Sequence, residues 1–221
     1  MHPLFPIDLK RFGINRVIRS FIISDLLIYG GWGLIGPIFG VFVLERIAGA
    51  RLITIGISVG IYWIIKSIVQ IPVAIYIDRH DGERDDFYAL ILGLVLGGFS
   101  ALAYLIPQTA IGLYVVSAVH GVAFAFYVPS WYAIFSRHLE KKHYAFDWAL
   151  DSTMLGIASG VTAIVGAGIA EFVSFEAVFV AAGIFSFASV LILLLVPHLI
   201  LPRVPKAGVA DDGHALVKKR V

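Results

Sequence analysis

Charged and titratable residues lie inside long apolar stretches of this chain, where each is expected to have an interaction partner or a functional role. Lys66 lies near the middle of its stretch, and an unpaired ammonium group at the centre of a bilayer costs on the order of 3 kcal/mol or more. We therefore expect Lys66 to pair with a carboxylate such as that of Asp25, or to bind an anionic group of a substrate. His120 and Asp151 lie in other stretches, and imidazole and carboxylate groups can exchange protons.

Aromatic and polar residues share helix faces with these groups. Trp63 lies three residues before Lys66 and Gln70 lies four residues after it, so the three side chains share one face of a helix. Phe124 follows His120 at the same spacing. These positions predict a polar and aromatic cavity wall. The candidate substrate or proton site consists of Asp25, Tyr29, Trp32, Trp63, Lys66, Gln70, His120, Phe124, Tyr127 and Asp151.

Several candidates also have a purely structural interpretation. Asp25 could neutralise neighbouring arginines, and His120 could be a buried, hydrogen-bonded histidine. Asp147 lies near the start of the same stretch as Asp151, where the positive end of a helix dipole favours an acid. Helix capping therefore explains Asp147 better than a role in the site, whereas Asp151 lies deeper and stays a candidate.

Other kinds of chemistry find no support in the residue types. The chain has no cysteine, which excludes disulfides and thiolate sites. Its histidines form no i,i+3 or i,i+4 pair within an apolar stretch, so we expect no metal site and no cofactor. Residues 56–60 spell Gly-x-Ser-x-Gly, but without a preceding strand they cannot form a nucleophile elbow. They predict a Gly-x-x-x-Gly packing face instead, as do Gly93/Gly97 and Gly156/Gly160.

The composition indicates that membrane-spanning helices position these residues. Hydrophobic residues make up 59% of the 221 residues and charged residues only 14%, and the mean hydropathy is +0.91. A soluble domain needs roughly a quarter of its residues charged, so a soluble enzyme, a nucleic-acid-binding protein and a disordered chain are excluded. Six stretches are long enough to cross a bilayer as helices, which predicts an all-α integral membrane protein. They lie near 20–45, 52–77, 87–106, 111–136, 148–171 and 176–200.

The sequence predicts one transmembrane domain between two charged ends. Residues 1–19 form a basic amino-terminal arm, residues 20–200 the six-helix domain and residues 201–221 a flexible tail. Of the 17 Lys and Arg residues, 14 flank the stretches on the side of both termini, against Arg46 and Arg51 on the other side. The positive-inside rule then predicts cytoplasmic termini in the inner cell membrane, and two copies should lie parallel.

The loop after the second stretch carries a recognisable motif. Asp78 and Arg79 end the stretch, Gly82 provides a turn, and Arg84 precedes the next stretch. This loop resembles the motif between helices two and three of the major facilitator superfamily, small-x-x-x-Asp-Arg/Lys-x-Gly-Arg/Lys-Arg/Lys. Ala74 stands where the family usually has Gly, and one extra residue separates Arg79 from Gly82. The resemblance implies that the loop steadies one conformational state of a transporter.

Small residues followed by a proline late in the helix occur at corresponding points of the first and fourth stretches. These segments run from Gly30 to Pro37 and from Gly121 to Pro129. This faint repeat is similar to the inverted three-plus-three arrangement inside one six-helix half of the superfamily. The fifth stretch is rich in glycine, as in the family's antiporters, but lacks their proline. Ser117 stands where the fourth helix of the family often carries a basic residue.

The resemblance implies a secondary transporter of a small molecule. Family members have twelve helices in two parallel halves around a cavity, and six helices correspond to one half. One half alone would expose its cavity wall to lipid, so we expect a parallel homodimer that works by alternating access and is open to proton coupling. The resemblance also implies that the first, second, fourth and fifth helices line the cavity. Lys66, present twice, favours an anionic or zwitterionic substrate.

Two other functions compete with transport. The first is a non-transporting assembly or regulatory subunit that pairs with another six-helix chain. The second is an intramembrane enzyme, which we disfavour because the sequence contains no recognisable Ser-His, paired-Asp or metal constellation at usable spacing. No phosphate-binding loop is present either, so transport driven by ATP would need another subunit.

Overall fold

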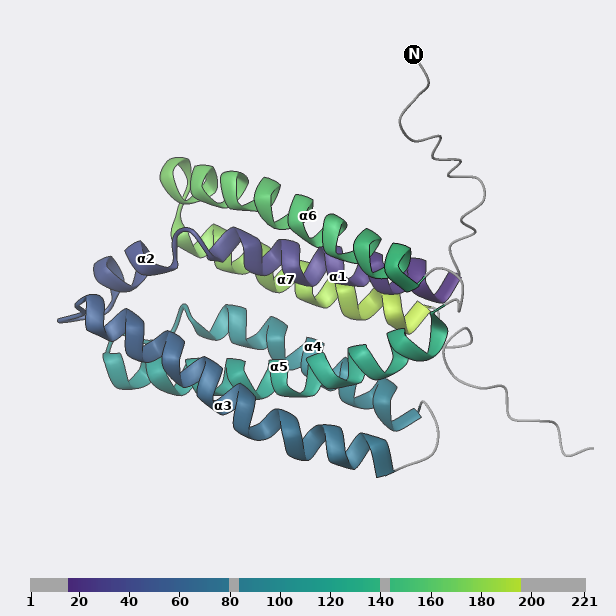
Figure 1. Cartoon of the computed structure of the whole chain (residues 1–221). Helices are drawn as coiled ribbons and strands as arrows, with labels where there is room; N and C mark the ends of the chain where they lie inside the picture. Colours follow the sequence, from purple (N-terminus) through teal and green to yellow (C-terminus); the bar gives the residue numbers. More distant parts are fainter. Residues whose placement is uncertain (1–15, 80–83, 140–143, 196–221) are drawn as a thin grey trace, which may run out of the picture.

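Helices make up nearly all of the chain that the structure describes. The computed structural model describes residues 16–79, 84–139 and 144–195 (Figure 1). Within these ranges there are seven helices and no strand. They are α1 (Arg16–Ile35), α2 (Phe39–Arg46), α3 (Leu52–Arg79), α4 (Arg84–Ala103), α5 (Ala110–His138), α6 (Tyr144–Phe172) and α7 (Phe175–Leu195).

Six of the seven helices are long and apolar enough to cross a membrane, all but α2. Their most apolar 18-residue windows have mean hydropathies from 1.3 to 2.7. The prediction of an all-α membrane protein with six spans is therefore confirmed for the described residues. Helix α1 already begins at Arg16, inside the predicted basic arm, while the predicted tail lies outside the described residues.

The first apolar stretch departs from its prediction. We expected one helix over residues 20–45, but α1 ends at Ile35, a turn occupies residues 36–38, and α2 follows. Pro37 lacks an N–H group, and its ring clashes with the preceding helical turn. Four of the seven residues before Pro37 are glycine, which weakens the helix further. The other five spans lie within a few residues of their predicted positions.

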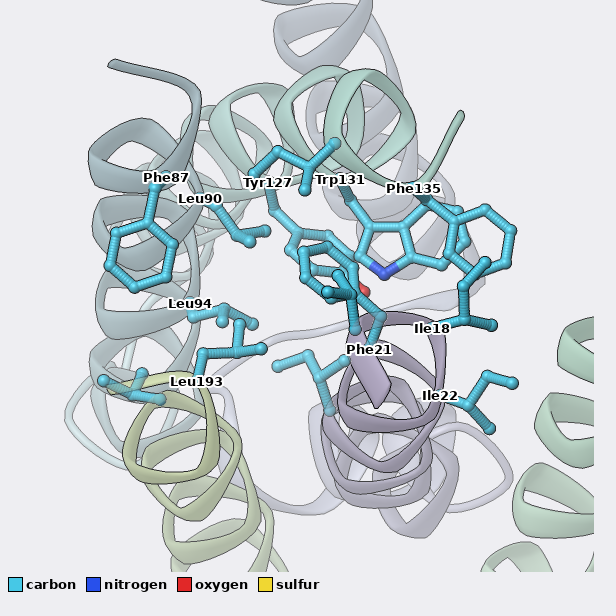
Figure 2. Close-up of a cluster of buried hydrophobic side chains, with 14 of the residues drawn as sticks. Ile18, Phe21, Ile22, Phe87, Leu90, Leu94, Tyr127, Trp131, Phe135 and Leu193 are labelled. Carbon is cyan, nitrogen blue, oxygen red and sulfur yellow. The ribbon is translucent and has the colours of Figure 1, made fainter. Parts of the chain in front are cut away.

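A buried core joins α1, α4, α5 and α7. Helix α4 packs against α5 and α7, and α1 packs against α6 and α7. Figure 2 shows side chains from all four core helices meeting in one cluster, among them Phe21, Leu90, Phe135 and Leu193. These four are at most 1% exposed. The core therefore fixes α1 and α5, the two helices that carry most of the candidate site residues.

Helices α3 and α6 flank this core on opposite sides. Helix α3 packs mainly on α5, and α6 packs mainly on α1 (Figure 1). Only 11% of the most apolar window is buried in each of them, against 44% to 56% in the other four spans. The buried residues of these two flanking helices are Thr54, Ser58, Ile77, Asp147, Asp151 and Gly166.

Glycines mark the closest helix crossings. A Cβ atom on Gly93 would lie 2.5 Å from the backbone nitrogen of Tyr127, and one on Gly166 would lie 2.2 Å from the carbonyl oxygen of Leu34. Helix α4 thus meets α5, and α6 meets α1, at separations that a larger residue would prevent. The packing face predicted at Gly93 is used.

The other two predicted glycine faces lie beside open space among the described residues. A Cβ atom on Gly56 or Gly60 of α3 would meet no atom within 4 Å, and the same holds for Gly156 and Gly160 of α6. The predicted packing faces at these two pairs are therefore not used within the described part of the chain. Both pairs lie on the two helices that flank the core.

Among the described residues, each end of the bundle carries one ion pair between helices. At the first end, where α1 begins and α5 ends, Arg137 donates to Asp86 at the start of α4. At the second end, where α2 lies, Arg46 donates to Glu176 at the start of α7. The Asp86 side chain is 0% exposed, whereas those of Arg46 and Glu176 are 49% and 47% exposed.

Candidate substrate-binding pockets

Two pockets lie along α1 and α5, one nearer each end of the bundle. The pocket nearer the first end has a volume of about 210 Å³ and lies between α1, α5 and α6. We name it the acidic pocket; its lining is Asp25, Tyr29, Tyr127, Val128, Trp131, Tyr132, Trp148, Asp151, Ser152 and Leu155.

The second pocket has a volume of about 230 Å³ and lies between α1, α3 and α5. We name it the histidine pocket; its lining is Trp32, Ile35, Gly36, Phe39, Ser58, Val59, Tyr62, Tyr104 and His120. Core helices α4 and α7 contribute no lining residue to either pocket, apart from Tyr104 just after the end of α4. The four lining spans are those that the family resemblance implied.

In the acidic pocket, Asp25 is 2% exposed and accepts a hydrogen bond from the hydroxyl of Tyr127. The bond joins α1 to α5 across 102 positions of the sequence. Tyr29 lies one turn along α1 from Asp25, and its ring centroid is 6.3 Å from that of Tyr127. The side chain of Asp25 therefore faces the pocket rather than the arginines at the start of α1.

Asp151 brings a second buried carboxylate to the same pocket. It lies on α6, is 5% exposed and acts electrostatically on Asp25. Its Oδ1 atom is buried and has no hydrogen-bond partner among the described residues. A buried carboxylate oxygen is costly to leave unpaired, so this atom is available to a ligand that can donate to it.

In the histidine pocket, His120 lies between aromatic rings. Its ring is stacked on Trp32, with centroids 3.8 Å apart and planes 8° apart, and the Tyr62 ring is 4.3 Å away. Its Nδ1 atom is 3.3 Å from the hydroxyl of Tyr104.

A hydrogen-bond chain defines which nitrogen of His120 carries a proton. Tyr104 donates to Ser117, which itself donates to the carbonyl oxygen of Leu113. When Tyr104 gives its one proton to Ser117, Nδ1 of neutral His120 is the donor in their contact. Nε2 is then an acceptor, and it has no hydrogen-bond partner among the described residues. Sequence reasoning missed Tyr104, because it lies in the third predicted stretch, to which the family resemblance gave no lining role.

Lys66 lies outside both pockets. Its Nζ atom is 4.7 Å from the ring centroid of Trp63, one turn away on α3, in a cation–π contact. It takes part in neither of the ion pairs found among the described residues, and Asp25 is bonded to Tyr127 instead. Trp63 is 54% exposed, and Gln70 also lines neither pocket. In this part of α3, Tyr62, which directly precedes Trp63, does line the histidine pocket.

The remaining candidate, Phe124, lies between the two pockets. Phe124 is 6% exposed and lies on α5 one turn from His120 and one turn from Tyr127. Its ring centroid is 5.7 Å from that of Trp32 and 5.6 Å from that of Tyr127. An aromatic layer thus divides the histidine pocket from the acidic pocket. Sequence reasoning left Trp131, Tyr132 and Trp148 out of the site, although Trp131 follows Tyr127 by one helical turn.

The loop motif lies at the first end of the bundle. Asp78 and Arg79 end α3 and Arg84 begins α4, while Gly82 lies outside the described residues. Asp78 acts electrostatically on Asp86, whose ion pair with Arg137 joins α4 to α5. The sequence had not distinguished Asp86 and Arg137 from ordinary loop charges. No group of three or more His, Asp or Glu residues in the described ranges could hold a metal ion.

The sequence comparison agrees with this architecture. The family model for the Major Facilitator Superfamily matches residues 21–219, which include five of the six spans in full and α1 from Phe21 onward. No curated protein sequence matches the chain. Because the match covers nearly the whole chain and the described residues form six spans with pockets on four of them, the chain belongs to the Major Facilitator Superfamily and is a multi-pass membrane transporter.

Proposed function

We propose that this chain transports a small molecule by alternating access and works as a parallel homodimer. We also propose that it lies in the inner cell membrane, with both termini in the cytoplasm. The exposure of α3 and α6 is the observation that carries the proposal, since only 11% of each apolar window is buried. These helices lie on opposite sides of the bundle (Figure 1), and each of them lines one of the two pockets. A second copy placed against them would enclose both pockets in one shared cavity.

The glycine faces of α3 and α6 support this arrangement. Gly56 and Gly60 on α3 have open space beside them, as do Gly156 and Gly160 on α6. Small residues let membrane helices approach closely, so such faces favour helix–helix association in lipid. In the proposed dimer, α3 of each copy packs on α6 of the other. This pairing leaves α4 and α7 facing lipid.

Within the dimer we assign roles to the polar groups. Asp25 and Asp151 are the candidates for the coupling proton, because both are buried and both line the acidic pocket. Lys66 of each copy would lie at the edge of the shared cavity and could bind a carboxylate of a zwitterionic or anionic substrate. The loop that contains Asp78 and Arg79 would steady one conformational state by contact with the partner copy.

Disulfide cross-linking between introduced cysteines tests the dimer directly, because the sequence contains no cysteine. Gly56 and Gly168 each lie four residues from the second end of the bundle, on α3 and α6 respectively, and both face open space. They are thus at the same depth, about 6 Å from their helix ends. We expect the double variant Gly56→Cys/Gly168→Cys to form a disulfide-linked dimer in membranes and in proteoliposomes.

The matched control places cysteines on the core helices. Leu92 of α4 and Leu191 of α7 are exposed, so Leu92→Cys/Leu191→Cys should react with maleimides but should not cross-link. Flux of candidate substrates into proteoliposomes, with and without a pH gradient, tests transport by the same preparation. A monomeric protein that transports would overturn the dimer, and a cross-linked dimer without flux for any substrate would favour an assembly subunit.

A further inference from the structure

The acidic pocket contains two carboxylates and no opposing charge. Asp25 and Asp151 come from α1 and α6 and are 2% and 5% exposed. None of the described residues that line the pocket is Lys, Arg or His. The groups that act on Asp25 are Tyr127, Asp151 and Trp131, and none of them is basic. The described residues therefore place no cation against these two carboxylates.

One carboxylate oxygen is free to accept a hydrogen bond. Tyr127 already donates to Oδ1 of Asp25, but Oδ1 of Asp151 is buried and has no partner among the described residues. Burial of such an oxygen is unfavourable unless a donor meets it. A ligand that carries N–H groups and a positive charge would satisfy both the hydrogen bond and the charge.

Aromatic rings form the remaining wall of this pocket. The rings of Trp131 and Trp148 have centroids 5.9 Å apart, and those of Tyr132 and Trp148 are 5.8 Å apart. Tyr29 lies against Tyr127 on the side of α1. The faces of aromatic rings attract cations within about 6 Å of the ring centroid. The aromatic wall therefore favours a positively charged ligand, as the two carboxylates do.

The size of the pocket limits the ligand. A volume of about 210 Å³ lies below the roughly 300–1,000 Å³ of pockets for drug-sized molecules. It suits a single ring or a short chain that carries one ammonium group.

We infer that the acidic pocket binds the protonated amine of a small organic substrate, with Asp151 as the acceptor of its N–H groups and the tyrosine and tryptophan rings around its apolar part. This inference rests on the proposed function, because it gives the charge class of the transported molecule. It is compatible with a zwitterionic substrate, whose carboxylate would bind elsewhere. It excludes a purely anionic substrate from this pocket.

Three probes that share a phenyl ring and differ in charge test the inference. They are phenethylammonium, phenethyl alcohol and hydrocinnamate, which are cationic, neutral and anionic at neutral pH. Binding to the purified full-length protein can be followed by calorimetry and by tryptophan fluorescence, since Trp131 and Trp148 line the pocket. We expect the cation to bind at least about tenfold more tightly than the alcohol, as a hydrogen bond to a charged group implies, and the anion not to bind.

Variants on one helix separate the pocket from general charge effects. Asp151→Asn should weaken binding of the cation about tenfold or more and leave binding of the alcohol unchanged. Glu171→Gln on the same helix lies 20 residues away from Asp151, about 30 Å along α6, and should change neither. Asp151→Glu should retain part of the cation affinity.

The outcomes for binding and for transport can be told apart. Equal affinity for cation and alcohol in the natural protein would overturn the inference without need of any variant, and so would an Asp151→Asn protein that binds the cation normally. Selective, Asp151-dependent binding without flux would uphold the amine site while contradicting the proposed transport. Flux of an anion alone, without cation binding, would uphold transport and overturn the amine site.

Discussion

The two ends of the bundle bury polar groups of different kinds. Toward the first end, four carboxylates are at most 5% exposed, those of Asp25, Asp86, Asp147 and Asp151. Toward the second end the buried polar groups are neutral, such as the hydroxyl of Ser58 and the hydroxyl of Tyr104. The ion pair at that end lies at the surface. Charge buried away from water depends on each of its partners far more than a neutral hydroxyl does, so the first end should be the more sensitive to substitution.

The largest effect should come from Arg137 at the first end. Arg137→Gln removes the cation from the fully buried carboxylate of Asp86, and loss of one partner of a buried ion pair costs about 3–5 kcal/mol. Because the Arg137 side chain is 39% exposed, we expect a loss near the lower limit, about 3 kcal/mol. Unfolding in mixed micelles with increasing SDS measures the free energy of unfolding.

The matched variant at the second end is Arg46→Gln. Its partner Glu176 is about half exposed, and water and salt screen ion pairs at the surface. We expect Arg46→Gln to change the free energy of unfolding far less than Arg137→Gln does. If the two variants destabilised the protein equally, the contrast between the two ends would be wrong.

A smaller loss should follow from Tyr127→Phe in the acidic pocket. The variant removes the hydroxyl that donates to Asp25, and a hydrogen bond to a charged group contributes about 1.5–3 kcal/mol. We expect the free energy of unfolding to fall by about 2 kcal/mol, measured by the same SDS titration. Tyr88→Phe is the control, since Tyr88 is 60% exposed on α4; a Tyr127→Phe protein as stable as this control would contradict the role given to the bond.

The contrast between the ends explains what the sequence could and could not predict. Hydropathy located five spans to within a few residues, because a bilayer requires about 20 apolar residues in a row whatever their neighbours are. The break after Ile35 needed the local effect of Pro37 on helix geometry. A hydropathy scale does not include that effect, so it could not predict the break.

Pairs of residues far apart in the chain were harder to predict. Asp25 and Asp151 were each candidates, yet nothing in a linear reading puts them in one pocket, because the packing of α6 on α1 depends on Gly166 fitting against Leu34. Lys66 was singled out by its depth, and its contact with Trp63 was foreseeable at one helical turn. The depth of Lys66 in the membrane did not reveal that its side chain lies outside both pockets.

A loss smaller than that of Tyr127→Phe should come from Tyr104→Phe at the second end. The variant removes a donor to Ser117 and the oxygen that meets Nδ1 of His120. Both partners are neutral, and a neutral hydrogen bond contributes about 0.5–1.5 kcal/mol. Each of these contacts is 3.3 Å long, so we expect a loss of about 1 kcal/mol in the free energy of unfolding.

Tyr104→Phe also sharpens the comparison between the pockets. His120 stays stacked on Trp32, so its place in the histidine pocket should persist in the variant. Affinity of the acidic pocket for phenethylammonium should not change, because Tyr104 lines only the other pocket. A loss larger than that of Tyr127→Phe, or a weaker affinity for the cation, would show that the two pockets are coupled through the aromatic layer of Trp32 and Phe124. The buried acids would then not be the main difference between the two ends.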